Sequence, residues 1–452
     1  MALIFAAMAA AADAGVGLGI GLLLLSLVCL GTWPAALRLC TYAPGVRVGV
    51  EGDNGCFRRL RRVAGRYAQS RHPCHAYLDY AIAYVAFSST VPILLSHLIP
   101  NEEESEYGAD ISGLQQVPLI LSAIVGGSLL SLGNMSTQWA TTVYASPLTT
   151  VLALQASLTV VLGTSINYKL EPSKTARPNL LAWGVVLFLV AIGLSVMAHH
   201  LYSNDRGHRK RDVVQSDEDE ANVEISMRNF TPALSQGQGA SDRTKAPVRH
   251  DDYRACRSDV DADSFTDDVT EQSHAPLRSA STAGLAIAFG GGLCFGFFSP
   301  AFNIAVNNPF GWGANGEMTA SGGLSVASAN LWFSLAFTLT SILWNVCLMR
   351  NPPRDVEPST FQQYLSERLM QDRAVAILAG LICAGGNVLQ FQGGHLAGFA
   401  TSDLVQAFPL VGTFWDVVIF REFSGAHRTI VVCLCCMYLV YVSGIILLAS
   451  SV

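Results

Sequence analysis

The sequence predicts an all-α membrane protein whose chain crosses the bilayer ten times. Hydrophobic residues make up 51% of the 452 residues and charged residues only 14%, which is more apolar sequence than a soluble domain needs. The apolar residues also fall in blocks long enough for membrane helices, which need about 20 residues each. A Gly-Asn pair recurs in two similar stretches, at Gly133-Asn134 and Gly386-Asn387, which indicates a duplicated chain.

The apolar blocks give the positions of the expected helices. They lie at 16–40, 77–100, 116–142, 146–168, 178–201, 282–307, 324–349, 373–397, 402–420 and 428–449. Five helices per half is an odd number, so the second half must enter the membrane in the opposite sense from the first. The sequence therefore predicts two inverted five-helix repeats, 1–200 and 282–452, an architecture typical of secondary transporters.

The segment 201–281 joins the two halves and has a different composition. It is rich in Asp, Glu, Ser, Arg, Gln and Thr and has few apolar residues. Such a segment does not bury enough surface to fold alone, so the sequence predicts a disordered cytoplasmic linker. Its serines, threonines and acidic run make it a candidate for phosphorylation or for binding a regulator.

The loops differ in charge. The segment 41–76 carries seven arginines, whereas the loop 101–111 has five acidic residues and no lysine or arginine. The start of the linker and the loop 350–373 are again basic, and the outer loop 169–177 is the exception. The positive-inside rule then predicts that both termini are non-cytoplasmic, and we expect the plasma membrane as the location.

The sequence shows no signature of an enzyme. It has no GxxxxGK[ST] phosphate loop and no HExxH or GxSxG motif. Cys56, His72, Cys74 and His75 have the residue types of a zinc site, but their spacing matches no common one. We therefore expect no catalytic activity, no cofactor, no metal and no nucleic-acid partner.

Uncharged polar side chains in the apolar blocks are the candidate substrate contacts. Asn387 and Gln390, and likewise Asn134 and Gln138, are spaced to share a helix face. Amides donate and accept hydrogen bonds, which suits a neutral heterocycle or a sugar, and aromatic rings can stack on a flat cargo. Lysine and arginine are missing away from the helix ends, which disfavours phosphorylated cargo. The candidate contacts are Trp33, Asn134, Gln138, Asn303, Asn387, Gln390, Gln392, Gln406 and Trp415.

A proline interrupts the first helix of each half, at Pro34 and at Pro300. Such a proline frees a backbone carbonyl, which either serves a substrate or only marks a packing kink.

Two acidic residues have alternative roles. Asp403 is the candidate proton-coupling group, because acids inside a membrane protein tend to be functional. The alternative is that Asp403 caps the helix that follows it. Asp79, at the start of a helix, either benefits from the helix dipole or takes part in transport.

Six stretches together resemble the plant ureide permeases. They are Gly31-Thr-Trp-Pro-Ala, Tyr77-Leu-Asp-Tyr, Ser131-Leu-Gly-Asn, Ile166-Asn-Tyr, Phe298-Ser-Pro-Ala-Phe-Asn and the run 386–415. The resemblance implies the ten-helix fold of drug/metabolite transporters and proton-coupled import of allantoin, uracil or related oxo-derivatives of nitrogen heterocycles. It does not extend to the linker, and Asp416 and Arg421 stand where the family has glycines. A sugar or other small-metabolite permease, or a non-transporting membrane receptor or scaffold, is the alternative.

Overall fold

A computed structural model gives the fold of most of the chain. It describes residues 14–41, 71–98, 116–144, 146–230, 282–312, 322–353, 356–367, 370–420, 423 and 425–452. In these ranges every regular element is a helix, and nine helices are long and apolar enough to cross a membrane. The predicted all-helical membrane class is therefore confirmed for this part of the chain.

Among the described residues, the first half has five long helices. They are α2 (Ala14–Thr41), α4 (Pro73–Leu98), α6 (Val117–Thr142), α7 (Leu148–Leu170) and α8 (Pro178–Phe230). The second half has four long helices. They are α10 (Thr282–Asn307), α11 (Val326–Arg350), α13 (Met370–Ala397) and α16 (Arg428–Ala449). The short helices η3 (Pro172–Lys174) and α12 (Phe361–Ser366) lie in connecting segments.

The segment 399–420 is a broken helix, whereas the sequence predicts one continuous helix at 402–420. Its pieces are α14 (Phe399–Ser402), the 3₁₀ turn η6 (Asp403–Ala407), α15 (Phe408–Trp415) and the π turn η7 (Asp416–Phe420). Gly398 has a φ of 86°, which allows the sharp turn from α13 into α14. Breaks of this kind are often found at functional sites.

The second predicted segment, 77–100, overlaps α4, which is helical but is not among the nine candidate membrane helices found in the described residues. The fifth helix differs more, because α8 continues to Phe230, whereas a disordered segment was predicted from residue 201 onward. Residues 202–230 contain one glycine and no proline and are rich in Arg, Asp and Glu, so their composition permits a helix. Residues 231–281 lie outside the described residues. The chain divides into two compact units, 1–200 with 278–452, and 201–277.

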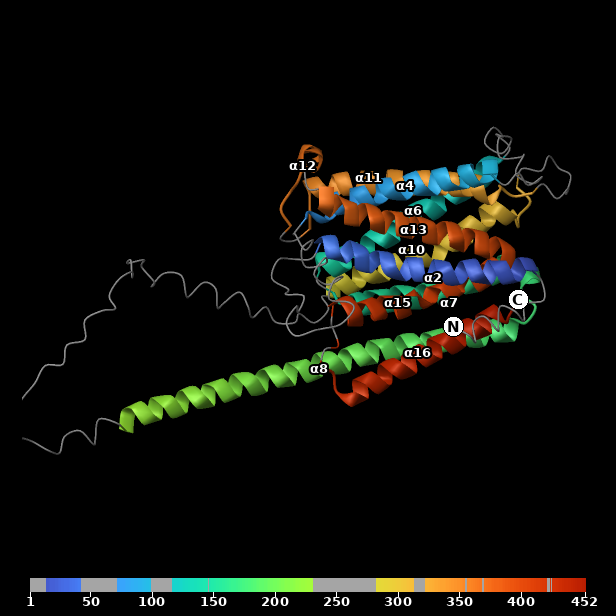
Figure 1. The fold of residues 1–452 in the computed structure, drawn as a ribbon. Coiled ribbons are helices and arrows are strands. Elements are labelled where there is room, and N and C mark those ends of the chain that lie inside the picture. Colours follow the sequence, from blue (N-terminus) through green and yellow to red (C-terminus); the bar gives the residue numbers. More distant parts are fainter. Residues whose placement is uncertain are drawn as a thin grey trace, which may run out of the picture. The chain divides into compact units, whose positions relative to one another are not determined.

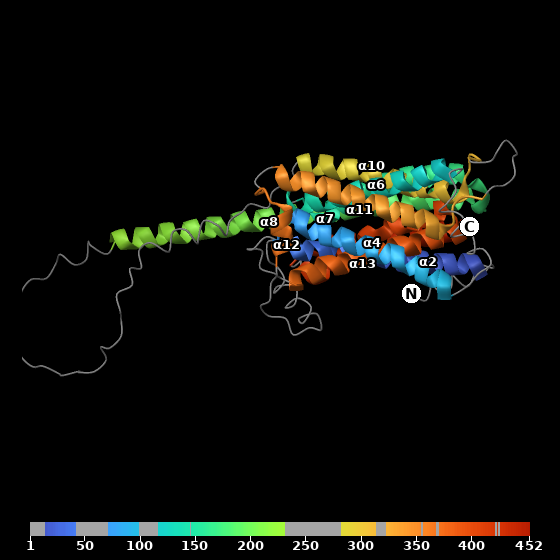
Figure 2. The same cartoon turned by 90° about the horizontal axis from the view of Figure 1, so that it is seen from above.

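The helices of the two halves pack against each other in corresponding pairs. The first helix of each half contacts the third helix of the other: α2 packs on α13, and α10 packs on α6. The second helices show the same exchange, since α4 packs on α13 and α11 packs on α6. Figure 1 shows α2 between α13 and α15, and Figure 2 shows α10 beside α6. Each half thus completes its packing with the other half.

Small residues let these helices approach closely. A Cβ at Gly386 of α13 would lie 2.7 Å from a methyl group of Leu30 on α2. The same holds between α8 and α16, where a Cβ at Gly184 would lie 2.2 Å from a methyl group of Leu448. Close approach at small residues is typical of membrane helix packing, because lipid supplies no hydrophobic force between helices.

Candidate substrate cavity

A cavity lies between α2, α6, α7, α10, α13, η6 and α15. Its empty volume, which includes space open to solvent, is about 440 Å³. The lining residues are Leu30, Trp33, Pro34, Leu130, Asn134, Thr137, Leu152, Phe295, Phe298, Cys383, Asn387, Gln390, Val405, Gln406 and Phe408. The polar groups in this wall all belong to uncharged residue types, so the cavity suits a neutral compound.

The wall formed by α2 includes the predicted proline interruption. Pro34 has no N–H for the carbonyl of Leu30, four residues earlier, and both residues line the cavity. The carbonyl of Leu30 therefore lacks its usual helical donor beside the empty space. Pro300 of α10 is buried but is not among the lining residues. The two prolines thus differ in role, although the sequence places them alike.

The structure brings together five of the nine predicted substrate contacts. Trp33, Asn134, Asn387, Gln390 and Gln406 all line the cavity and are all buried. They come from α2, α6, α13 and η6, so both halves of the chain contribute. Amides that recur in the two halves of the sequence therefore line the same cavity.

The amides of the cavity differ in how far the protein satisfies them. Asn134 Nδ2 donates to the Tyr80 hydroxyl at 2.7 Å. Asn387 Nδ2 donates to the Cys383 carbonyl at 3.1 Å, whereas its Oδ1 has no partner among the described residues. Gln390 is 1% exposed, and neither its Nε2 nor its Oε1 has a partner there. Because buried polar groups are nearly always paired, Gln390 has one donor group and one acceptor for a ligand.

The other four predicted contacts lie elsewhere. Gln138 lines a smaller neighbouring chamber, and its Nε2 donates to the carbonyl of Pro73 at 2.9 Å. Asn303 donates to Asn167 in a buried asparagine cluster. Gln392 is half-buried on α13 outside the cavity wall. Trp415 also lies outside it, and its Nε1 donates to a threonine of α2 at 3.0 Å.

Sequence reasoning missed several residues of the cavity wall. Thr137 lines it, and its hydroxyl donates to Gln155 Oε1 at 2.8 Å. The Gln155 amide in turn donates to the Ser136 hydroxyl at 3.0 Å. Cys383 also lines the cavity and is not among the predicted contacts. Its spacing of four from Asn387 was a usable signal, because residues four apart share a helix face.

Two other aromatic side chains of the apolar blocks, Phe391 and Trp139, do not line the cavity. Phe391 stacks on Phe302, with the ring centroids 3.7 Å apart. Trp139 is buried outside the cavity wall. Trp33 is the predicted aromatic that does face the cavity, and its ring lies 5.3 Å from that of Tyr80.

Asp403 is fully buried at the start of η6, where the helix is broken. Neither carboxylate oxygen has a hydrogen-bond partner of ordinary geometry among the described residues. Its polar neighbours are the side chains of Thr164 and Asn167 on α7. Gly163 makes room for it, since a Cβ there would lie 3.2 Å from Asp403 Oδ1. This placement gives no support to the capping role, because a cap would accept a backbone hydrogen bond.

Asp79 and the candidate zinc ligands lie at the start of α4, outside the cavity. Asp79 is the seventh residue of α4, beyond the first turn in which a helix dipole acts, so the dipole explanation is not supported. Its charge is instead compensated by ion pairs with two arginines. His72 Nε2 lies 3.2 Å from the carbonyl of Glu357, and burial lowers its pKa, as does the neighbouring His75. Cys56 lies outside the described residues.

These observations define a helical, multi-pass membrane protein with a mostly apolar cavity between its two halves, into which a few uncharged polar side chains converge. An apolar chamber with a few convergent polar groups is the usual form of a small-molecule site.

Comparison with known proteins identifies the family to which the chain belongs. The family model for ureide permease matches residues 76–451. The chain is 30% identical to Ureide permease 2 of Arabidopsis thaliana, over 95% of this chain and 96% of that protein. It is also 30% identical to Ureide permease 1 of Arabidopsis thaliana, over 95% of both chains, and to Probable ureide permease A3 of Vigna unguiculata, over 90% of this chain and 96% of that one. The chain therefore belongs to the ureide permease family, a family of transporters rather than enzymes.

Proposed function

We propose that this protein is a secondary transporter that imports allantoin, uracil or related oxo-derivatives of nitrogen heterocycles through the central cavity. The named relatives are ureide permeases. Ureides, like the oxo-derivatives of nitrogen heterocycles, carry alternating N–H and C=O groups. The wall of the cavity supplies uncharged amide and hydroxyl groups that such a cargo could pair with.

The observation that carries the proposal is the unpaired amide of Gln390. A lactam or imide edge presents one N–H beside one C=O, and it would pair with both groups of a primary amide. Asn387 Oδ1 adds a second unpaired acceptor on the same face of α13. The side-chain nitrogen of Asn387 already donates to a backbone carbonyl, so its oxygen, which has the Tyr84 hydroxyl as a polar neighbour, is the group available to a cargo. Trp33 gives the flat ring of the cargo an aromatic surface.

The proposed coupling group is Asp403. A buried carboxylate without a cation is costly, so its protonated form is favoured unless a cation or water compensates. The described residues give it no ion pair. Its place at the start of η6 in the broken helix, close in sequence to the cavity residues Val405 and Gln406, would allow protonation and cargo binding to influence each other. This placement supports proton coupling over the sequence-based alternative of a helix cap.

The architecture that we propose is the ten-helix arrangement with two inverted repeats of the drug/metabolite transporters. It is supported by the exchanged packing of corresponding helices, α2 on α13 and α10 on α6. It is also supported by α4, which has the length of a membrane helix and would be the tenth span. In such repeats the substrate site lies where the halves meet, which is where this cavity lies.

We further propose a plasma-membrane location with both termini non-cytoplasmic and the segment 201–281 in the cytoplasm, where regulators would bind it. The support is the charge of the loops, although most arginines of the segment 41–76 and all of 101–111 lie outside the described residues. Labelling of Cys256 by an impermeant thiol reagent added to intact cells would contradict this orientation.

Uptake by cells or vesicles tests the function. Wild-type protein should accumulate labelled allantoin or uracil, and Gln390→Leu should take up the same substrates with a higher KM. An unpaired cargo group costs about 1–3 kcal/mol, which corresponds to an increase in KM of about one to two orders of magnitude. Gln392→Leu is the matched control, because Gln392 lies on the same helix outside the cavity wall.

Competition separates the alternatives. Inhibition of uptake by glucose but not by allantoin would indicate a sugar permease. No substrate-dependent uptake by a correctly folded protein at the membrane would instead favour a receptor or scaffold. Equal KM values for Gln390→Leu and Gln392→Leu would show that the unpaired amide does not bind the cargo.

A further inference from the structure

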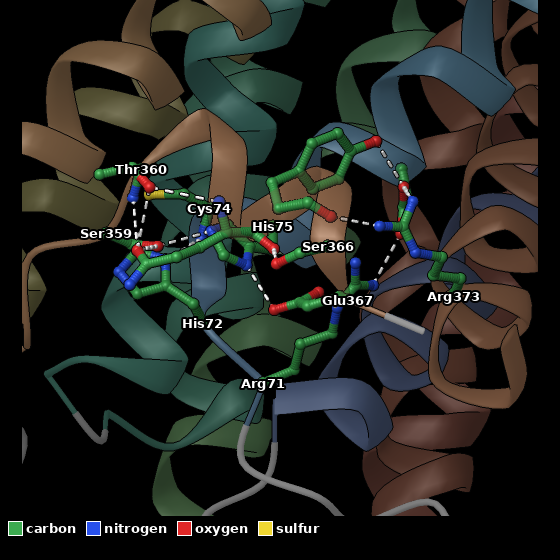
Figure 3. A network of polar contacts seen from close by, with 12 residues as sticks. Arg71, His72, Cys74, His75, Ser359, Thr360, Ser366, Glu367 and Arg373 are labelled. Carbon is green, nitrogen blue, oxygen red and sulfur yellow. Dashed lines mark hydrogen bonds and ion pairs between the residues drawn. The ribbon is translucent and has the colours of Figure 1, made fainter. Parts of the chain in front are cut away.

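A second buried polar cluster lies where α4 begins (Figure 3). Arg71, just before α4, forms ion pairs of 2.7 Å with both Asp79 and Glu367. His75 Nδ1 lies 2.5 Å from Glu367 Oε1, and its Nε2 lies 2.8 Å from Ser359 Oγ. The cluster therefore ties the first turns of α4, in the first half of the chain, to the segment around α12, in the second half.

Asp79 receives further donors from the second half. The Tyr364 hydroxyl donates to Asp79 Oδ1 at 2.7 Å, and Arg373 Nη1 lies 3.5 Å from the same oxygen. Arg373 also donates to the Tyr364 carbonyl and lies 4.8 Å above the Tyr364 ring. We call these residues together the α4–α12 latch: Arg71, His75, Asp79, Ser359, Tyr364, Glu367 and Arg373.

The latch holds charged groups in a mostly buried position. The side chains of Arg71 and Asp79 are each 5% exposed and that of Glu367 is 29% exposed. Burial favours the neutral form of Glu367, but the hydrogen bonds from His75 and Arg71 outweigh it and hold its pKa below the ordinary value. Glu367 therefore stays ionised at neutral pH and keeps its pairing with Arg71.

Buried ion pairs of this kind are a poor means of stabilising a fold, because apolar side chains of similar volume serve as well or better. Separating the partners, however, leaves buried charges unpaired, so partly opened arrangements are disfavoured. A cluster with these properties favours two discrete states, closed or fully separated, which is what a conformational switch requires.

The latch is also joined to the substrate cavity. Tyr80 follows Asp79 on α4, and its hydroxyl accepts a hydrogen bond from Asn134, which lines the cavity. At the first residue of α4, the Pro73 carbonyl accepts from Gln138, which lines the chamber next to the cavity. The first two turns of α4 thus contact the latch on one side and the cavity wall on the other.

We infer that the α4–α12 latch is a gate of the cavity at the end of the bundle where α4 begins. When the ion pairs of Arg71 and Asp79 with the second half break, the first turns of α4 move away from α12, and the cavity exchanges with that side. The inference rests on the proposed function, since a gate is needed only if cargo passes through the cavity. A latch of purely structural importance would hold the fold together without governing access.

Thiol labelling measures access directly, because Cys383 lines the cavity. The experiment uses the full chain with Cys383 as its sole cysteine, reconstituted in vesicles, and an impermeant methanethiosulfonate reagent. The reagent is added on the side from which a separate Glu357→Cys variant is labelled. Glu367→Gln keeps the shape of the side chain but removes its charge, and it should speed labelling about tenfold, which corresponds to about 1.4 kcal/mol in the opening equilibrium.

Glu357→Gln is the matched control. Glu357 is exposed in the same segment, and its contact with His72 is made by its backbone carbonyl, so this variant should be labelled at the wild-type rate. Equal rates in Glu367→Gln and Glu357→Gln would overturn the gate. An equal acceleration from the opposite side of the membrane would also overturn it, because it would indicate general loosening.

A second variant covers the case in which Glu367→Gln does not fold. Tyr364→Phe loses only the hydroxyl that donates to Asp79, and it should also speed labelling from the α12 side, by a smaller factor. Unchanged labelling in this variant would then count against the gate. Labelling needs no substrate, so a failure of uptake by the wild-type protein would refute the proposed function without producing either of these results.

Discussion

The close packing of α6 against α11 makes a specific prediction at Gly127. A Cβ at this position would lie 2.0 Å from the carbonyl oxygen of Phe333 and 2.8 Å from its carbonyl carbon. Ordinary contact begins near 3.4 Å, so Gly127→Ala requires a separation of about 3.4 − 2.0 = 1.4 Å at this point. The atoms in the way belong to the backbone of α11, so no side chain can rotate to relieve the clash.

The expected loss of stability follows from two opposing effects. Overpacking of a tight interface costs about 1–3 kcal/mol, and a clash with backbone belongs at the upper end of that range. Alanine is favoured over glycine inside a helix by about 1 kcal/mol. Gly290→Ala, on α10, gains the same helix preference without a clash, since no atom lies within 4 Å of its Cβ. Gly127→Ala should therefore be about 2–3 kcal/mol less stable than Gly290→Ala.

Unfolding of the purified protein in mixed detergent micelles, followed by circular dichroism, measures this difference. Uptake should fall as well in Gly127→Ala, because α6 carries the cavity residue Asn134. The reasoning would be refuted if the two variants unfolded at the same denaturant concentration, since α6 and α11 could then not be in backbone contact at Gly127.

Two further predictions concern acidic residues. Asp403→Asn should abolish accumulation driven by a proton gradient while exchange of labelled for unlabelled substrate continues; unchanged accumulation would rule out Asp403 as the coupling group. Glu171, just after α7, has its pKa raised by burial, against the opposing effects of the Phe399 N–H and Lys174. When the pKa of an acid is higher in the folded state than in the unfolded state, the protein loses stability as the pH rises from the unfolded-state pKa through the folded-state pKa. Glu171→Gln should thus raise the melting temperature at pH 7 and leave it unchanged below about pH 4; an equal change at both pH values would contradict this cause.

The sequence by itself determined the class of the protein and the placement of its helices. Nine of the ten predicted apolar blocks correspond to single helices among the described residues, and the block 402–420 corresponds to a broken one. The agreement arises because the thickness of a bilayer sets a minimum length for an apolar segment. The same reasoning placed polar amides inside the membrane, where hydrocarbon cannot satisfy them, and so identified Asn387 and Gln390 as functional candidates. The boundary of α8 was not predicted in this way, because a polar, charged helix in water has no apolar pattern to mark its end.

Only the tertiary structure decided which of the candidate side chains meet. Gln138 and Asn134 share a helix face by spacing, yet Asn134 lines the cavity and Gln138 is held by the first carbonyl of α4. The rotation of each helix about its axis depends on its neighbours, and here those neighbours come from the other half of the chain. The partnership of Arg71 with Glu367 was equally hidden, because 296 residues separate them and local sequence patterns report only on contacts within a helix.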